Sequence, residues 1–258
     1  MCELLGVTAK RRRRLNDLLR EFYSHSNEHP HGWGLACFPE NGTPVLEKEP
    51  MEARTSPRLK ERLAAPVVER TVIAHIRHAS VGQLAYKNSH PFIATDNRGR
   101  TWTLAHNGTI FNGAALNDYM GIQYGDTDSE RVLLNLVDRI DHAQNHLHRA
   151  LDAKERFDVL DTAIAALAKG NKLNLLIHDG EALYAHVNFQ DSLYFLQDEN
   201  AVVFSTCPLG AGNWKPVPFT RLVAVQDGEF VREGRPHGHE YIYNPEDYRL
   251  IYLDFARL

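Results

Sequence analysis

Strand-like segments occupy both ends of this 258-residue chain, and two amphipathic helical segments lie between them. Each helical segment carries its apolar residues on one face: Val132, Leu133, Leu136, Val137 and Ile140 in the first, and Val159, Leu160, Ala163, Ile164 and Leu167 in the second. Strands and helices that are segregated along a chain favour the α+β class. We therefore predict sheets packed under helices.

The expected strands are short runs rich in apolar and β-branched residues. They span residues 2–7, 32–38, 45–47, 71–77, 101–106, 173–177, 182–189, 193–196, 202–205 and 222–225, and a further helix is expected over 15–22. The pairs Asp179-Gly180 and Asp227-Gly228 are typical of hairpin turns. No repeat, linker or change of composition divides the chain, so we predict one domain over residues 1–258.

A capping-box pattern opens the first of the two central helices. In the block Thr127-Asp128-Ser129-Glu130, Thr127 is the expected N-cap residue, and Glu130 is expected to reach back to the N-cap backbone. Asp128 then lies in the first helical turn, where the helix dipole stabilises a negative charge.

The composition is that of an ordinary globular protein, with 43% hydrophobic and 24% charged residues. The net charge of -4 has the wrong sign for a protein that binds nucleic acid through phosphate contacts. A basic run at 10–14 leads into apolar residues at helical spacing, so we interpret it as the exposed start of a helix. No apolar run approaches the ~20 residues of a membrane span, and no signal peptide is recognisable. We expect a cytoplasmic protein that binds neither nucleic acid nor membranes.

The three cysteines, Cys2, Cys37 and Cys207, do not form a disulfide framework, because their number is odd and the sequence is that of a reducing compartment. Cys37 lies in an apolar strand and is expected in the core. Cys207 precedes a proline in a turn-like segment and has no evident partner.

Cys2 differs from the other two because it follows the initiator methionine. If Met1 is removed, Cys2 carries both a thiol and a free α-amine, whose ordinary pKa of about 8 suits a base near neutral pH. Nucleophile and base then belong to one residue, which is the N-terminal-nucleophile arrangement. The alternative is a buried, inert cysteine at the start of a strand.

Six short blocks follow one another in the first half of the chain: MCELLG at 1–6, HGWG at 31–34, HIRHASVG at 75–82, NSHPF at 88–92, AHNG at 105–108 and TDSE at 127–130. Together they resemble the class II glutamine amidotransferases, most closely the stand-alone bacterial members. The resemblance implies the four-layer αββα sandwich of the N-terminal-nucleophile hydrolases. It also implies that Cys2 attacks the γ-carboxamide carbon of glutamine, or of a γ-glutamyl compound, and forms a thioester.

The resemblance assigns the stabilisation of the tetrahedral oxyanion to the side chain of Asn107 and the backbone N–H of Gly108. Such donors must lie where negative charge develops. The alternative interpretation of Asn107 and Gly108 is a hairpin turn after the strand at 101–106, and both interpretations can hold together.

Substrate binding is assigned, by the same resemblance, to Arg77, Ser80, His90 and Asp128. Arg77 would bind the α-carboxylate bidentately, and Asp128 would bind the α-ammonium group. Ser80 would offer a hydroxyl near the head group, while His90 would either contact the substrate or order its loop. Without the resemblance, Arg77 is a residue at a strand end and Asp128 a charge at a helix start.

The chain departs from the family pattern at two positions. His31 stands where many relatives have an acidic residue, which affects the hydrogen bonding of that loop. Val81 stands where some synthase-linked relatives have a histidine, so the acceptor side of the site is expected to differ.

The fourteen histidines raise the question of a metal site, at His25, His29 and His31 or at His142 and His146. Two imidazoles on one helix face, as at His142 and His146, do not make a site without a third ligand, and no metal-binding motif accompanies either set, so we predict no metal. The chemistry also requires no cofactor, and no phosphate-binding glycine loop is present.

Three functions remain open at this point. In the first, the chain would hydrolyse the γ-glutamyl amide of a small metabolite. In the second, it would be a glutaminase subunit that supplies ammonia to a separate synthase, since we expect no fused synthase domain in a chain of this length. In the third, Met1 is retained and the protein binds γ-glutamyl compounds without catalysis. The sequence does not indicate an oligomeric state.

Overall fold

The computed structural model describes residues 2–40 and 43–247. Its four α-helices are α1 (Asn16–Ser24), α2 (Pro57–Ala64), α3 (Asp128–Leu147) and α4 (Ala153–Ala168). Its short 3-10 helices are η1 (His25–Glu28), η2 (Ala53–Thr55), η3 (Tyr86–Asn88) and η4 (Ala114–Tyr119). None of the helices in these ranges is long and apolar enough to cross a membrane.

Thirteen strands form two antiparallel sheets in the described part of the chain. The first sheet has the order β11 (Lys215–Pro216), β9 (Tyr194–Gln197), β10 (Ala201–Ser205), β1 (Glu3–Arg14), β4 (Val68–Ile76), β2 (Trp33–Phe38) and β3 (Val45–Glu49). The second has the order β13 (Glu229–Glu233), β12 (Leu222–Gln226), β8 (Leu183–His186), β7 (Lys172–His178), β6 (Thr101–Thr109) and β5 (Phe92–Thr95). The expected hairpin turns join β7 to β8 and β12 to β13.

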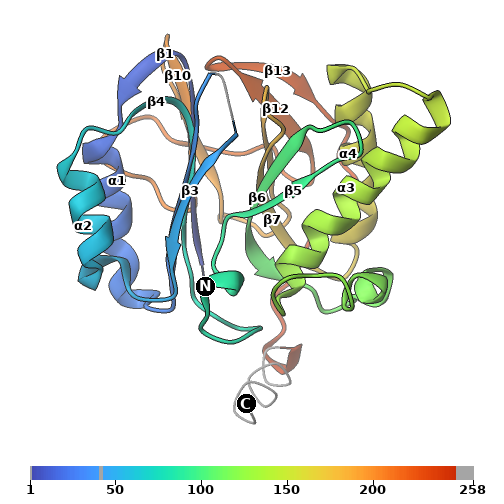
Figure 1. The fold of residues 1–258 in the computed structure, drawn as a ribbon, viewed down its shortest axis with the longest axis horizontal. Helices are drawn as coiled ribbons and strands as arrows, with labels where there is room; N and C mark the ends of the chain where they lie inside the picture. The colour runs from blue at the N-terminus through green and yellow to red at the C-terminus, as the bar shows by residue number, and fades with distance from the viewer. Residues whose placement is uncertain (1, 41–42, 248–258) are drawn as a thin grey trace.

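The two sheets lie face to face, with α1 and α2 on the outer side of the first and α3 and α4 on the outer side of the second (Figure 1). This arrangement confirms the α+β class and the αββα layers. Successive side chains of a strand point to opposite faces of its sheet, so one strand contributes to two cores. Leu4 of β1 packs between the sheets, whereas Leu5 packs under α1 and α2. A third core lies between the second sheet and its helices.

The start of α3 differs in part from the capping box that the sequence predicts. Thr127 is the N-cap residue, and its side chain accepts a hydrogen bond from the backbone N–H of Glu130. The carboxylate of Glu130, however, accepts from the N–H groups of Tyr124 and Gly125 rather than from the N-cap backbone. Glu130 therefore fixes the loop that enters the helix.

The basic run at 10–14 belongs to β1 and does not begin a helix, so this prediction was wrong. Helix α1 begins only at Asn16. Pairing with neighbouring strands extends β1, and acidic residues of adjacent segments balance its charge: Lys10 lies 2.7 Å from Glu229, and Arg13 lies 3.4 Å from Asp198. The apolar residues at helical spacing after the run do form a helix, but this helix starts after the basic run and not within it.

Candidate active site

A small cavity gathers most of the predicted site residues at the end of the sandwich where the chain begins. It is lined by six of the seven: Cys2, Arg77, Ser80, His90, Gly108 and Asp128. Its volume is about 20 Å³, which is room for about one water molecule. Asn107, the seventh, is buried next to Gly108 in β6 but does not contribute to the lining.

The ends of four elements bring these residues together. Cys2 directly precedes β1 and Arg77 directly follows β4, and the antiparallel pairing of these strands puts the start of one beside the end of the other. Gly108 lies near the end of β6 in the second sheet, and Asp128 is the first residue of α3. The cavity thus combines both sheets with a helix N-terminus.

The thiol of Cys2 is half-buried and is held by the backbone of His78. The N–H of His78 donates to Sγ over 3.2 Å, and Sγ lies 3.4 Å from the carbonyl oxygen of the same residue. Burial raises the pKa of the Cys2 thiol above its ordinary value, and the hydrogen bond from His78 offsets part of that rise. An N–H donor at this position favours the thiolate.

Asn107 and Gly108 lie inside strand β6 and not in a hairpin turn. They pair with Asn174 and Leu173 of β7, and the strand continues to Thr109. The hairpin alternative was therefore wrong, because cross-strand pairing holds both residues in extended backbone.

Position 108 accepts only glycine in this backbone. A Cβ atom there would lie 2.0 Å from the carbonyl oxygen of Lys172 and 2.3 Å from Nε2 of His106. The ring of His106 occupies this space because its Nε2 donates to the Lys172 carbonyl over 3.1 Å, and its Nδ1 lies 2.9 Å from the Ser129 hydroxyl. Since the carbonyl can only accept, Nε2 carries the proton and Nδ1 accepts.

Arg77 is only 2% exposed, and its guanidinium group organises the segment that follows it. It donates to the carbonyl oxygens of Val81 and Gly82 over 2.8 Å and 3.2 Å, and to that of Gln83 over 3.0 Å. Burial lowers the pKa of Arg77, and the negative charge of nearby Asp128 is among the influences that raise it. The cavity therefore contains a buried cation whose donors face backbone oxygens.

The carboxylate of Asp128 is buried and fixed by neighbouring N–H groups. Its Oδ2 accepts from the backbone of Ile110 over 2.9 Å, and its Oδ1 accepts from the backbone of Ser129 over 2.9 Å. The position at the start of α3 also favours a negative charge. These contacts give the cavity a fixed anion, as a bound ammonium group requires.

Ser80 and His90 also face the cavity. Neither ring nitrogen of His90 has a hydrogen-bond partner among the residues that the structure describes, although the residue is only 4% exposed. Its ring packs 4.1 Å from the ring of His75, and burial holds the pKa of His90 well below its usual range. His90 is therefore a neutral imidazole whose side chain does not order its loop through described hydrogen bonds.

His31, which stands where many relatives have an acidic residue, takes part in ordering the same segment. Its Nδ1 accepts a hydrogen bond from the backbone N–H of Ala79 over 2.9 Å. The imidazole thus does what a carboxylate at this position would also do, which is to accept from the chain that carries Ser80.

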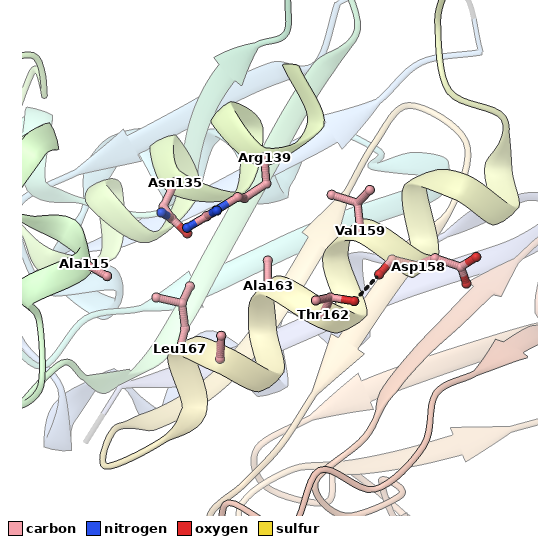
Figure 2. Close-up of a pocket in the computed structure, with 9 residues that line it drawn as sticks. Ala115, Asn135, Arg139, Asp158, Val159, Thr162, Ala163 and Leu167 are labelled. Atoms are coloured by element: carbon pink, nitrogen blue, oxygen red, sulfur yellow. Dashed lines mark hydrogen bonds between the residues drawn. The ribbon is translucent and has the colours of Figure 1, made fainter. Parts of the chain in front are cut away.

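A larger cavity of about 450 Å³ lies elsewhere, in the groove between α3 and α4 (Figure 2). Its walls include Ala115, Val159, Ala163 and Leu167. None of the predicted site residues lines this groove, and its lining contains no cysteine, serine or histidine. The larger of these two cavities therefore does not contain the predicted nucleophile, Cys2.

Comparison with known proteins identifies the family of this chain. A family model described as class II glutamine amidotransferases matches residues 1–197, which is more than half of the chain. The chain belongs to the class II glutamine amidotransferases. An Escherichia coli protein whose name marks it as a candidate glutamine amidotransferase is 29% identical, over 72% of this chain and 72% of its own. A functionally unassigned protein of Methanocaldococcus jannaschii is also 29% identical, over 90% of this chain and 71% of its own.

Solved structures of other glutamine amidotransferases share the fold. A Pseudomonas aeruginosa protein described as a predicted glutamine amidotransferase superposes with a TM-score of 0.60 at 23% identity, over 90% of this chain and 100% of its own. Glutamine phosphoribosylpyrophosphate amidotransferase of Bacillus subtilis superposes with a TM-score of 0.65 at 15% identity, over 91% of this chain. This chain spans about half of the B. subtilis enzyme, 49% of its length.

Sequence patterns did not identify three residues that line or surround the cavity of this class II glutamine amidotransferase: His78, His106 and Lys172. His78 and His106 lie within the recognised blocks, but no role was assigned to them. Lys172 lies outside the blocks and is 1% exposed, with Nζ 4.5 Å from the centre of the Phe189 ring. The only sequence signal for it is a lysine at the start of an apolar strand. Burial lowers the pKa of Lys172 to about 8, and the charge of Cys2 opposes that shift.

Proposed function

We propose that this protein is an amidohydrolase of the class II glutamine amidotransferase type, which cleaves the γ-amide of glutamine or of a small γ-glutamyl compound through a thioester on Cys2. The observation that carries the proposal is the cavity in which the Cys2 thiol, the Gly108 backbone, Arg77 and Asp128 meet. A nucleophile, an N–H donor, a cation and an anion are the four groups that a γ-glutamyl head group and its reacting carbonyl require.

The proposed reaction has two steps through tetrahedral intermediates. In the first, Sγ of Cys2 bonds to the γ-carbonyl carbon, the carbon–nitrogen bond breaks, and the amine leaves with the proton of the thiol. In the second, water attacks the thioester carbon, the carbon–sulfur bond breaks, and the carboxylate product leaves as the thiol regains a proton. The backbone N–H of Gly108 and the side-chain amide of Asn107 stabilise the oxyanion in both steps.

The base for the first step is the α-amine of Cys2, after removal of Met1, which lies outside the described residues. Arg77 binds the α-carboxylate and Asp128 the α-ammonium group, and Ser80 and His90 contact the head group. Neither ring nitrogen of His90 has a hydrogen-bond partner in the described part of the chain, which supports a substrate contact for this residue.

Substrate entry requires the segment at 79–83 to move. The cavity of about 20 Å³ is smaller than an amino acid, and one of its walls consists of residues from this segment. The segment has no helix or strand, and hydrogen bonds from Arg77 hold its carbonyl groups. An incoming α-carboxylate would replace these carbonyls as the acceptor for Arg77, which couples substrate binding to opening.

A panel of γ-glutamyl compounds tests the proposal. We expect release of amine from glutamine or from one γ-glutamyl amide, with a γ-glutamyl adduct on Cys2 detectable by mass spectrometry after acid quenching. Rapid turnover of one small amide without a partner identifies a metabolic amidohydrolase. Slow glutamine hydrolysis that rises with a co-purifying synthase identifies an ammonia-supplying subunit. Turnover without an adduct on Cys2 would exclude the thioester mechanism.

Intact-mass measurement of protein produced in an ordinary bacterial host tests the base. We expect a mass that lacks Met1, which frees the amine of Cys2. Full retention of Met1 together with tight binding of a γ-glutamyl compound would instead identify a binding protein, because the thiol would then lack its α-amine.

A further inference from the structure

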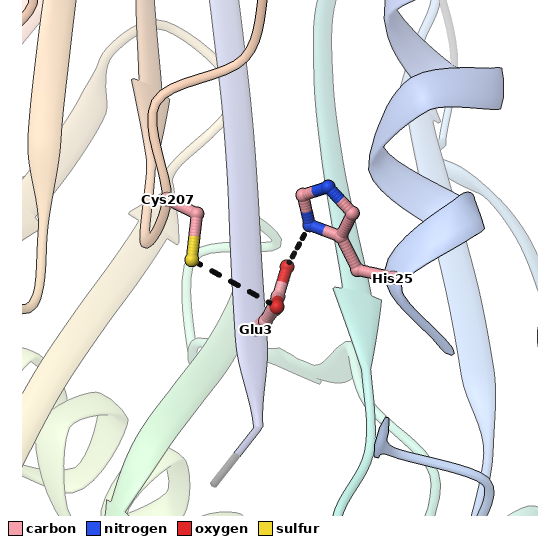
Figure 3. A group of neighbouring side chains, drawn as sticks. All are labelled: Glu3, His25 and Cys207. Atoms are coloured by element: carbon pink, nitrogen blue, oxygen red, sulfur yellow. Dashed lines mark hydrogen bonds and ion pairs between the residues drawn. The ribbon is translucent and has the colours of Figure 1, made fainter. Parts of the chain in front are cut away.

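A second group of reactive side chains lies at the start of strand β1 (Figure 3). It consists of Glu3, His25 and Cys207. One ligand atom from each residue, a carboxylate oxygen, an imidazole nitrogen and the sulfur, lies within 4.8 Å of the other two. The three residues come from the start of β1, from η1 and from the loop after β10.

We propose that Glu3, His25 and Cys207 form a binding site for one Zn²⁺ ion. A thiolate, an imidazole and a carboxylate are ligands that zinc accepts, and three protein ligands plus a water complete a tetrahedral site. Zinc ligands lie about 2.0 to 2.3 Å from the metal, so neighbouring ligand atoms in a tetrahedron lie about 3.3 to 3.8 Å apart.

The observed distances are close to those of such a site. Nδ1 of His25 lies 3.0 Å from Oε2 of Glu3, and Sγ of Cys207 lies 3.9 Å from Oε1 of Glu3. The two distances end on different oxygens of the Glu3 carboxylate, and one ligand atom from each of the three residues lies within 4.8 Å of the others, so the side chains must draw closer together to surround a metal. A metal bound to Nδ1 of His25 and Oε2 of Glu3 would replace the proton of the hydrogen bond between these two atoms.

His29 contacts the carboxylate of Glu3, one of the three proposed ligands. Its Nε2 lies 3.3 Å from Oε1 of Glu3, and its side chain is only 10% exposed. A hydrogen bond from a buried imidazole orients a ligating carboxylate and increases metal affinity. The carboxylate of Glu3 is itself buried, whereas Cys207 is exposed, so a metal from solvent can reach the site past the sulfur.

A metal at this site would fix the residue that directly follows the proposed nucleophile. The side chain of Glu3 points away from the cavity, because successive residues of a strand face opposite sides. The site would thus join the start of β1 to two other segments without entering the cavity. The proposal does not rest on the proposed function, and a catalytically inactive protein would still bind the metal.

Titration of the reduced, metal-free protein with Co²⁺, a spectroscopic substitute for Zn²⁺, tests the site. We expect saturation at one equivalent, tetrahedral ligand-field bands and a sulfur-to-cobalt charge-transfer band, all lost when Zn²⁺ displaces Co²⁺. Zn²⁺ should also raise the midpoint of thermal unfolding, and a chelator should reverse the rise. Absence of a charge-transfer band in the wild-type protein would overturn the proposal.

Four variants identify the ligands. Cys207→Ser should remove the charge-transfer band, and His25→Ala should weaken Zn²⁺ binding by about 100-fold or more, as loss of a ligand does more than loss of an orienting hydrogen bond. Both residues are partly exposed, so both variants should fold, which circular dichroism of the metal-free proteins checks. Cys2→Ala and His142→Ala, at a thiol in the cavity and an exposed imidazole of α3, should bind Co²⁺ as the wild type does. A band lost in Cys2→Ala and kept in Cys207→Ser would refute the assignment.

Discussion

The backbone N–H of His78 donates a hydrogen bond to Sγ of Cys2 over 3.2 Å, so the segment after β4 holds the thiol that precedes β1. This contact depends on the antiparallel pairing of β1 with β4, which sets the start of one strand beside the end of the other. A backbone donor cannot be removed by a side-chain substitution, so tests of the nucleophile must change the thiol itself.

Substitution of Cys2 by alanine should lower γ-amide hydrolysis by at least about a thousandfold, because no other group can form the thioester. Binding of a non-hydrolysable glutamine analogue should remain close to that of the wild type, since Arg77 and Asp128 are unchanged. Ammonia release and calorimetric binding measure the two effects. As a matched control, Cys207→Ser removes an exposed thiol and should keep full turnover in the absence of metal. Activity that survived Cys2→Ala would place the nucleophile elsewhere.

Lys172 should make the Cys2 thiol more acidic. The positive charge of Lys172 is among the influences that lower the pKa of Cys2, against the larger effect of burial, which raises it. Substitution of Lys172 by methionine removes the charge and keeps a long side chain beside Phe189, so the pKa of the thiol should rise. The pH dependence of Cys2 alkylation by iodoacetamide, followed by peptide mass, should then shift to higher pH. The exposed Lys169→Met variant is the control, and an equal shift in both variants would argue against a local charge effect.

Local patterns predicted the helices with an apolar face and the strands with a continuous apolar run. The apolar faces of α3 and α4 were predictable because helical periodicity reports which face is buried, and β7 was predictable as a short apolar run, which is typical of a strand buried on both faces. The cavity was predictable in part because short sequence blocks carry its residues, so Cys2, Arg77 and Asp128 were named although they are far apart in the chain. No periodicity in the sequence brings these three together; the resemblance did.

The contacts that sheet register creates were not predictable. Leu5 of β1 pairs with Ser205 of β10, and this register brings Glu3 beside Cys207, a residue for which no partner was evident from sequence patterns. In the same way, the pairing of β6 with β7 places Lys172 next to the proposed oxyanion residue Gly108. Such neighbours depend on which strands pair and in which register, and neither is encoded within a single segment.

Asp128 should contribute to substrate binding through its charge. In Asp128→Asn the side chain keeps its shape and an oxygen for the N–H of Ile110, but it loses the charge proposed to bind an α-ammonium group. A hydrogen bond to a charged group is worth about 1.5 to 3 kcal/mol, so kcat/KM for the preferred substrate should fall about 10- to 100-fold, mainly through KM. The exposed Asp118→Asn variant is the control. An unchanged KM for Asp128→Asn would remove this residue from the binding site.

Gly108 should be intolerant of any side chain. In Gly108→Ala the added Cβ would meet the Lys172 carbonyl oxygen and the His106 ring, neither of which can move without breaking strand pairing or a buried hydrogen bond. The free energy of unfolding should fall by about 3 kcal/mol, at the upper end of the cost of overpacking. Gly121→Ala is the matched control, because no atom of residues 2–40 or 43–247 lies within 4 Å of the added Cβ, and it should change stability by less than about 0.5 kcal/mol. Urea unfolding followed by circular dichroism compares the two, and equal stabilities would show that β6 can shift at this position.

A buried ion pair between α4 and the β7–β8 turn provides a test of stability against pH. Nε of Arg156 lies 2.7 Å from Oδ2 of Asp179, and the two side chains are 4% and 0% exposed. The Tyr184 hydroxyl donates to the same oxygen over 2.8 Å. Burial by itself raises the pKa of Asp179, but Arg156 and backbone N–H groups lower it by more, so the pKa lies below its ordinary value.

The lowered pKa of Asp179 determines how the free energy of unfolding changes with pH. A carboxylate whose pKa is lower in the folded state stabilises the fold above its unfolded pKa of about 3.9, and this contribution is lost as the pH falls through the folded value. Asp179→Asn should therefore lower the free energy of unfolding by about 3 kcal/mol near neutral pH, because it leaves Arg156 buried with one partner fewer. The difference from the wild type should shrink below about pH 4. The exposed pair of Asp158 with Lys154 gives the control, since Asp158→Asn should change stability by less than about 1 kcal/mol at every pH. A difference for Asp179→Asn that stayed constant down to about pH 3 would mean that its effect comes from packing and not from charge.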